Sequence, residues 1–170
     1  MSTSTAASPL RVGVIGAGWP GERHAEGYQA LGTAKVVAVS DLDANRRAAF
    51  AALYGVPRTY ADYNDLLADP EVEAVSIALP NFLHAPVAIA ALTAGKHVLC
   101  EKPPAVTLAE AHAMAEAAKH HGRLLVYALQ RRFNPASEML RERLAEGTLG
   151  EIYHARAVWT RTWGVPRGVG

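Results

Sequence analysis

The stretch that decides the fold is residues 16–21, Gly-Ala-Gly-Trp-Pro-Gly, which directly follow the short apolar run Arg11–Ile15. In this pattern Gly16 permits a tight turn, Gly18 lets a pyrophosphate approach the backbone, and Gly21 allows a helix to pack against the strand. The helix that follows would offer its N-terminal N–H groups to the phosphates. The pattern therefore predicts a dinucleotide-binding site, and a glycine-rich turn of purely structural origin is the alternative.

An acidic residue, Asp41, follows the next apolar run, Lys35–Ser40. Its distance from Gly16 is near the roughly 20 residues expected for a carboxylate that binds the cofactor ribose. Such a carboxylate accepts hydrogen bonds from ribose hydroxyls and repels a 2′-phosphate, which favours NAD over NADP. Arg46 and Arg47 come soon after and could meet a phosphate, but a solvated helix face is the favoured interpretation of both.

Short β-branched runs alternate with Ala- and Leu-rich stretches of helical spacing along most of the chain. Apolar strands separated by helices predict an α/β fold, a doubly wound parallel sheet covered on both sides. Glycines that follow the helical stretches and a capping box at Thr107 and Glu110 mark the boundaries. The expected strands are Arg11–Ile15, Lys35–Ser40, Ala74–Leu79, His97–Cys100 and Leu124–Leu129. The expected helices are Gly21–Leu31, Asp43–Tyr54, Asp62–Leu67, Ala85–Ala94, Leu108–His121 and Asn134–Gly147.

The composition excludes several classes of protein. Of the 170 residues, 50% are hydrophobic and 19% charged, a balance that argues against a disordered chain. The net charge of +1 gives no basic excess for binding nucleic acid or an anionic membrane. Cys100 is the only cysteine, which excludes disulfides and thiolate zinc sites within the chain, and no metal site is expected. The first ten residues lack a signal-peptide pattern, so a cytoplasmic protein is expected.

A second signal, Glu101-Lys102-Pro103, follows the strand-like run His97–Cys100. Ligands of open α/β sheets bind at the carboxyl ends of the strands. A lysine in that position, close to a bound nicotinamide, could handle the proton of a substrate hydroxyl. A surface lysine at a strand-to-loop corner is the alternative.

These stretches together resemble the Gfo/Idh/MocA oxidoreductase family. The resemblance rests on residues 16–21 with His24, residues 79–81 with His84, residues 94–103, and residues 131–135, Arg-Arg-Phe-Asn-Pro. It implies a Rossmann domain and an NAD(P)-dependent dehydrogenase. Such an enzyme transfers a hydride between nicotinamide and a carbinol carbon of a sugar, inositol or related polyol.

The resemblance also implies the site residues. Lys102 corresponds to the active-site lysine near the reacting carbon. His24 and His97 are expected to be structural, and Cys100 to be a small core residue rather than a nucleophile. The cofactor-binding residues that it implies are Gly16, Ala17, Gly18, Trp19, Gly21 and Asp41, then Pro80, Asn81, His84 and Glu101 around the nicotinamide half, with Gln130 and Arg132 near nicotinamide and substrate.

Three domains are expected: a flexible tail over residues 1–9, a Rossmann domain over 10–130, and a linking helix that opens an incomplete second domain over 131–170. Ile152–Thr160 reads as the first strand of that second domain, and the sequence after Thr162 is loop-like. The family normally continues further, so we expect a fragment that is inactive alone and a homo-oligomer when full length. The alternatives are a non-catalytic nucleotide-binding module or sensor, and a Rossmann domain for another nucleotide such as an adenylate.

Overall fold

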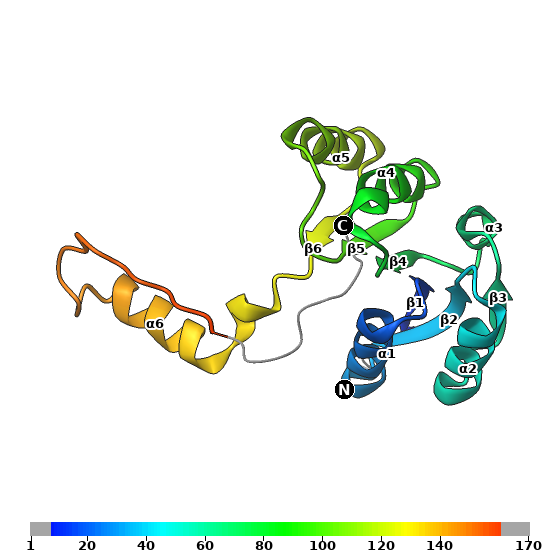
Figure 1. Ribbon diagram of the computed structural model, residues 1–170, viewed down its shortest axis with the longest axis horizontal. Coiled ribbons are helices and arrows are strands. Elements are labelled where there is room, and N and C mark those ends of the chain that lie inside the picture. Colours follow the sequence, from blue (N-terminus) through cyan, green and yellow to red (C-terminus); the bar gives the residue numbers. More distant parts are fainter. Residues whose placement is uncertain (1–7, 161–170) are drawn as a thin grey trace, which may run out of the picture. The chain divides into compact units, whose positions relative to one another are not determined.

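A computed structural model describes residues 8–160 in two units, the first ending at Ala128 and the second beginning at Leu129. The predicted tail and terminal loop therefore fall mostly outside the described residues. The first unit holds six parallel strands in the order β3-β2-β1-β4-β5-β6, and this doubly wound sheet confirms the expected fold class (Figure 1). The strands are β1 (Leu10–Ile15), β2 (Ala34–Ser40), β3 (Arg58–Tyr60), β4 (Ala74–Ile77), β5 (His97–Cys100) and β6 (Leu125–Tyr127). The helices between them are α1 (Trp19–Leu31), α2 (Ala44–Tyr54), α3 (Tyr63–Ala68), η1 (Asn81–Leu83), α4 (His84–Thr93) and α5 (Leu108–His121).

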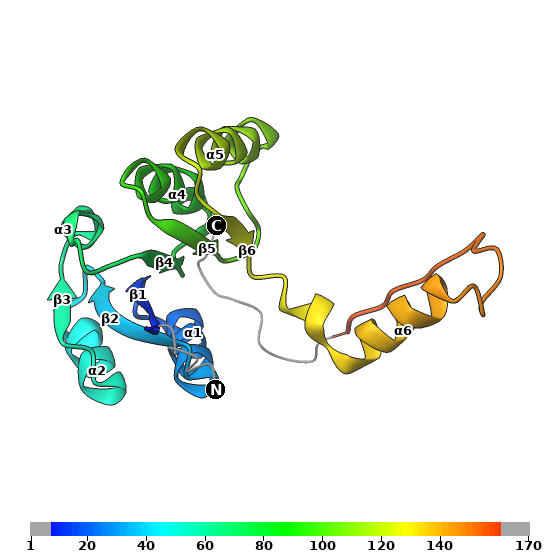
Figure 2. The same ribbon diagram turned by 180° about the vertical axis from the view of Figure 1, so that it is seen from behind.

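Helices cover both faces of this sheet. Figures 1 and 2 show α1 and α2 on one face and α3, α4 and α5 on the other. Each face has its own hydrophobic cluster, one containing Ala25 and Phe50, the other Leu66, Leu92 and Met114. Burial on both faces explains why the strands read as apolar runs rather than as alternating patterns.

Caps mark the helix boundaries, and those at Thr107 and at the glycines were predicted from the sequence. The side chain of Asp43 accepts hydrogen bonds from two backbone N–H groups at the start of α2. Thr107 and Glu110 form the predicted capping box at the start of α5. Three helices end as expected at glycines in the left-handed region, Gly32, Gly55 and Gly122.

Lys96, just before β5, is a buried polar residue that the sequence did not single out. Only 8% of it is exposed, and its ammonium donates to the carbonyl oxygens of Asp69 at 2.8 Å and Val72 at 2.7 Å. Burial lowers the pKa of Lys96, and the nearby carboxylate of Asp69 opposes this shift. The lysine thus connects the turn before β4 to the start of β5. These segments lie at the amino ends of the strands, and the glycine loop lies at the carboxyl ends.

Replacing Lys96 by methionine is expected to lower the free energy of unfolding by about 3 kcal/mol, because two buried carbonyl oxygens lose a charged donor. Urea unfolding of Lys96→Met measures the loss. Lys35→Met, at an exposed lysine in β2, is the matched control and should change stability by less than about 0.5 kcal/mol. Equal losses in the two variants would contradict this account of Lys96.

Among the strands of the first unit, one was not predicted and two are shorter than expected. Strand β3 was not predicted, because three residues at the sheet edge, Arg58–Tyr60, are too few to show a period. The strand expected over Ala74–Leu79 ends at Ile77, and the one over Leu124–Leu129 shortens to Leu125–Tyr127. None of these differences changes which strands are neighbours or which loops lie at the carboxyl ends of the strands.

The second unit contains η2 (Gln130–Phe133) and α6 (Pro135–Ala145), which Asn134 caps through the N–H of Ala136. Ile152–Thr160, expected to be a strand, carries no helix or strand. A strand needs a neighbour for its hydrogen bonds, and the described part of this unit contains no other strand.

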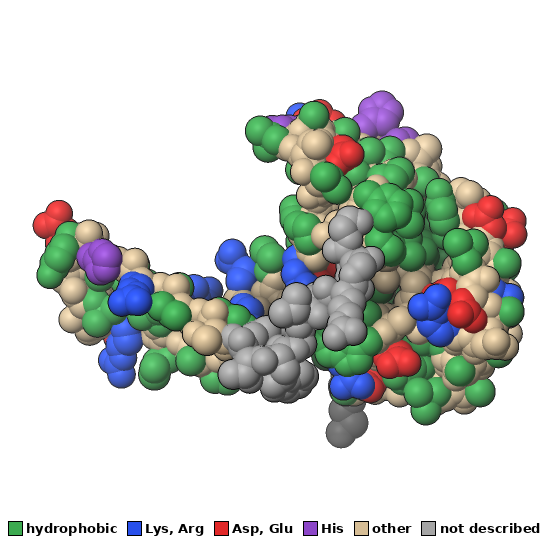
Figure 3. All heavy atoms as spheres, viewed as in Figure 1, with side chains coloured by type: hydrophobic (Ala, Val, Ile, Leu, Met, Phe, Trp, Pro, Cys, Tyr) green, Lys and Arg blue, Asp and Glu red, His purple; other side chains and the backbone are tan. Residues whose placement is uncertain are grey.

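The surface of the described residues agrees with the balanced composition. On the face shown in Figure 3, acidic and basic side chains are interspersed. Within residues 8–160, no helix has both the length and the apolar character needed to cross a lipid bilayer.

Candidate dinucleotide-binding site

The glycine loop follows β1 at the carboxyl ends of the strands. A side chain would meet different surroundings at each of its three glycines. Gly16 has a φ of +100°, and a Cβ there would lie 2.3 Å from the carbonyl oxygen of Ala78. A Cβ on Gly21 would lie 2.0 Å from the carbonyl oxygen of Gly16. At Gly18, by contrast, the nearest atom to an added Cβ would be 3.9 Å away. Packing therefore requires the first and third glycines, while the second leaves open space where a ligand could approach.

Helix α1 begins directly after this open position. Gly18 is its N-cap and provides no side-chain hydrogen bond to the first turn. Trp19, the first helical residue, has 70% of its surface exposed. A helix N-terminus without a side-chain cap suits an anionic group, because its backbone N–H groups and the positive end of the helix dipole point toward it.

Asp41, at the end of β2, contacts the glycine loop directly. Its Oδ2 accepts a hydrogen bond from the N–H of Ala17 at 2.9 Å, and its Oδ1 accepts one from the N–H of Asp43 at 2.8 Å. The guanidinium of Arg46 lies 3.6 Å from Oδ1, and its side chain is 57% exposed. Each carboxylate oxygen keeps a further lone pair, so Asp41 could still accept hydrogen bonds from ribose hydroxyls. Arg47, expected on a solvated helix face, is partly buried and donates a hydrogen bond to the backbone oxygen of Asp41.

A mainly apolar pocket of about 410 Å³ lies beside Asp41. Its volume and its mainly apolar lining suit a largely apolar group such as a nucleobase. The part of the lining that follows β3 was not predicted from the sequence, because β3 itself was not predicted. The lining residues are Ile15, Ser40, Asp41, Leu42, Ala61, Asp62, Tyr63, Asn64, Leu79 and Leu83.

Pro80, in the loop after β4, and Asn81, the first residue of η1, are both exposed. His84, expected beside the nicotinamide, is completely buried. Its Nε2 lies 2.8 Å from the carbonyl oxygen of Leu79, and its Nδ1 lies 2.7 Å from that of Pro103. The imidazole thus joins the loop after β4 to the loop after β5 through backbone atoms.

Glu101 and Lys102 follow β5 at the carboxyl ends of the strands. The Lys102 side chain is 56% exposed, and its Nζ lies 3.8 Å from Oε2 of Glu101. Oε1 of Glu101 lies 3.2 Å from Nε2 of His24, a contact that the sequence analysis did not foresee. Cys100, just before them, is buried, and burial raises the pKa of its thiol to about 12. Its thiol therefore stays protonated at neutral pH and packs as a core group.

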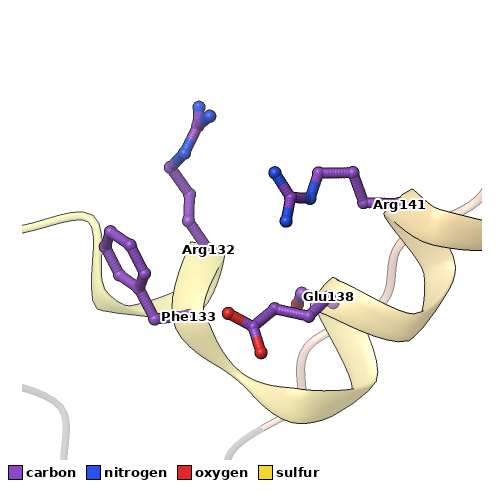
Figure 4. Close-up of a pocket in the computed structure, with 5 residues that line it drawn as sticks. Arg132, Phe133, Glu138 and Arg141 are labelled. Carbon is purple, nitrogen blue, oxygen red and sulfur yellow. The ribbon is translucent and has the colours of Figure 1, made fainter. Parts of the chain in front are cut away.

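Gln130 and Arg132 belong to the second unit, in η2. This unit has a pocket of about 330 Å³, lined by Arg132, Phe133, Ser137, Glu138 and Arg141. Figure 4 shows Arg132, Phe133, Glu138 and Arg141 around it. The neighbouring Arg131 places its guanidinium 4.0 Å from the centre of the Trp159 ring. The first unit thus carries the glycine loop, Asp41, Pro80, Asn81, Glu101 and Lys102, all in the segments that follow the carboxyl ends of β1, β2, β4 and β5.

A doubly wound sheet with a glycine loop after β1 and an acidic residue after β2 defines the class of dinucleotide-binding Rossmann domains. Residues 10–129 match the Gfo/Idh/MocA family, described as an oxidoreductase family with an NAD-binding Rossmann fold. The chain belongs to this family.

Named relatives extend the comparison. D-glucoside 3-dehydrogenase of Escherichia coli K12 is 38% identical over 167 residues, which cover 98% of this chain and 48% of the relative. The structure of levoglucosan dehydrogenase in complex with NADH and levoglucosan has a TM-score of 0.80 and 33% identity, covering 84% of this chain and 41% of that one. The structure of myo-inositol 2-dehydrogenase from Lactobacillus plantarum has a TM-score of 0.80 and 31% identity, with 85% and 43% covered. The chain spans about half the length of the curated relatives it matches.

Proposed function

We propose that this chain supplies the cofactor-binding half and the active-site lysine of an NAD-dependent dehydrogenase for a sugar, inositol or related polyol. One observation carries the proposal. The glycine loop is hydrogen-bonded to Asp41 at the carboxyl ends of the parallel strands, and Lys102 follows β5 at these same ends. The substrate class is supported by relatives whose names specify a glucoside, levoglucosan and myo-inositol. The match of residues 10–129 to an NAD-binding family supports the cofactor class.

The residues present fit a dinucleotide. The open position at Gly18 and the N–H groups at the start of α1 would receive the pyrophosphate. Asp41 would accept hydrogen bonds from the adenosine ribose, and the adjoining pocket would hold the base. By the family resemblance, Pro80, Asn81 and Glu101 would lie on the nicotinamide side. His84 would support this side indirectly, because its imidazole contacts the loops after β4 and β5.

The chemistry divides between the cofactor and the protein. When bound, NAD would accept a hydride from the carbinol carbon of the substrate. Lys102, as the uncharged amine, would orient the substrate hydroxyl and take up its proton on Nζ to become the ammonium; its exposed side chain can present Nζ at the carboxyl ends of the strands. We propose further that residues 131–170 lead into a substrate and oligomerisation domain, that Gln130 and Arg132 act near the substrate, and that the full enzyme is a cytoplasmic homo-oligomer.

Calorimetric titration of the chain with NADH and NADPH tests the proposal. NADH is expected to bind at least about tenfold more tightly, because the Asp41 carboxylate would face the 2′-phosphate of NADPH. Asp41→Ser should narrow this gap, since a hydroxyl can still accept from Ala17 but carries no charge. Asp65→Ser, at an exposed aspartate on α3, is the matched control and should leave the ratio unchanged. Equal affinities in the unmodified chain would overturn the role given to Asp41, and no binding of either cofactor would overturn the proposed function.

A further inference from the structure

His24 and Glu101 are separated by 77 positions in the sequence and meet in the fold. His24 lies in the second turn of α1, and Glu101 directly follows β5. Nε2 of the histidine lies 3.2 Å from Oε1 of the carboxylate. Both side chains are largely buried, with 11% and 15% of their surfaces exposed. The contact thus joins the helix behind the glycine loop to the loop that carries the lysine.

The second carboxylate oxygen of Glu101 faces Lys102. Oε2 accepts a hydrogen bond from the backbone N–H of Lys102 at 3.0 Å and lies 3.8 Å from its Nζ. One carboxylate therefore contacts the histidine through Oε1 and the lysine through Oε2. Any rotation of the Glu101 side chain would change both contacts together.

The histidine makes this contact at a cost. A carboxylate accepts but does not donate, so Nε2 of His24 must carry the hydrogen that points at Oε1. Nδ1 of His24 is then buried with no hydrogen-bond partner among the described residues. A buried polar atom without a partner is unfavourable, and such an atom in a native structure calls for an explanation. Holding a largely buried carboxylate in one orientation is such an explanation, because a buried charge needs donors.

We propose that His24 is a positioning residue for Lys102. It holds the Glu101 carboxylate through Oε1, so that Oε2 stays against the backbone N–H and the side-chain Nζ of the lysine. This inference rests on the proposed function, in which Lys102 receives the substrate proton. His24 itself touches neither cofactor nor substrate in this scheme and acts only through Glu101.

Nuclear magnetic resonance on the whole chain tests the proposal. The His24 ring is expected to carry its hydrogen on Nε2, which the nitrogen chemical shifts of the imidazole report. In His24→Phe, which keeps a ring but removes the donor, the Lys102 amide should exchange with solvent about tenfold faster. In His24→Gln, whose amide nitrogen reaches about the position of Nε2, the exchange rate should return close to that of the unmodified chain. His112→Gln, at an exposed histidine on α5, is the control.

The outcomes separate this inference from the proposed function. A His24 ring with its hydrogen on Nδ1 and none on Nε2 in the unmodified chain would overturn the inference, even if the phenylalanine variant fails to fold. An unchanged Lys102 exchange rate in a folded His24→Phe, or equal loss in the phenylalanine and glutamine variants, would overturn it as well. NADH titration of the unmodified chain tests the proposed function separately, because a chain that binds no NADH could still show the pair of His24 and Glu101 by resonance.

Discussion

Replacing Lys102 by methionine is expected to slow hydride transfer to NAD by about 10²- to 10⁴-fold, the range over which a positioned acid or base contributes. Methionine keeps a long unbranched side chain but cannot accept the proton of a substrate hydroxyl. NADH binding should stay within about twofold, because the glycine loop and Asp41 are untouched. Steady-state kinetics with a panel of sugars and polyols measures the loss, in a form of the protein that contains the second half present in its relatives.

The control for this experiment is Lys119→Met, which removes an exposed lysine near the end of α5. It should leave both turnover and NADH binding unchanged. If Lys102→Met turns over as fast as the unmodified enzyme, the lysine is not the proton acceptor. If no form of the protein turns over but NADH binds, the non-catalytic nucleotide-binding module becomes the better interpretation.

Substitution of Gly21 by alanine is expected to destabilise the first unit by about 3 kcal/mol, because overpacking against fixed backbone is among the more damaging changes. The added methyl would lie 2.0 Å from the carbonyl oxygen of Gly16 and 3.2 Å from a methyl of Val14. The first contact is with the backbone of the glycine loop and the second with β1, on which α1 packs, so the helix would have to move away. NADH binding should be lost with it, because the helix N-terminus belongs to the site.

Gly18→Ala is the matched comparison in the same loop. Its methyl meets nothing closer than 3.9 Å, so the thermal unfolding midpoint should stay near that of the unmodified chain. NADH should nevertheless bind at least about tenfold more weakly, because the methyl occupies the space through which a pyrophosphate approaches. Urea unfolding and NADH titration of both variants check these results. A stable Gly21→Ala, or a Gly18→Ala that binds NADH as tightly as before, would contradict the division of roles among the glycines.

Much of the fold could be predicted from the sequence, because its signals are local. The glycine pattern at 16–21, the capping box at Thr107 and the glycines that end helices each act on residues within a turn or two. Apolar runs separated by helical stretches suffice to predict a parallel sheet with two covered faces. Strand β3 escaped prediction because its three residues are too few to show a period, and its pairing with β2 makes it a strand. Conversely, Ile152–Thr160 has strand-like residues and no strand, because the described second unit provides no neighbouring strand.

The sequence by itself thus determined the class of fold, the glycine loop and the edge on which Asp41 and Lys102 lie. Only the tertiary structure decided which side chains meet there. It pairs Ala17 with Asp41 across 24 positions, and His24 with Glu101 across 77. The physical reason is that propensity and periodicity describe neighbours along the chain, whereas these contacts depend on strand order and on how each helix packs over the sheet.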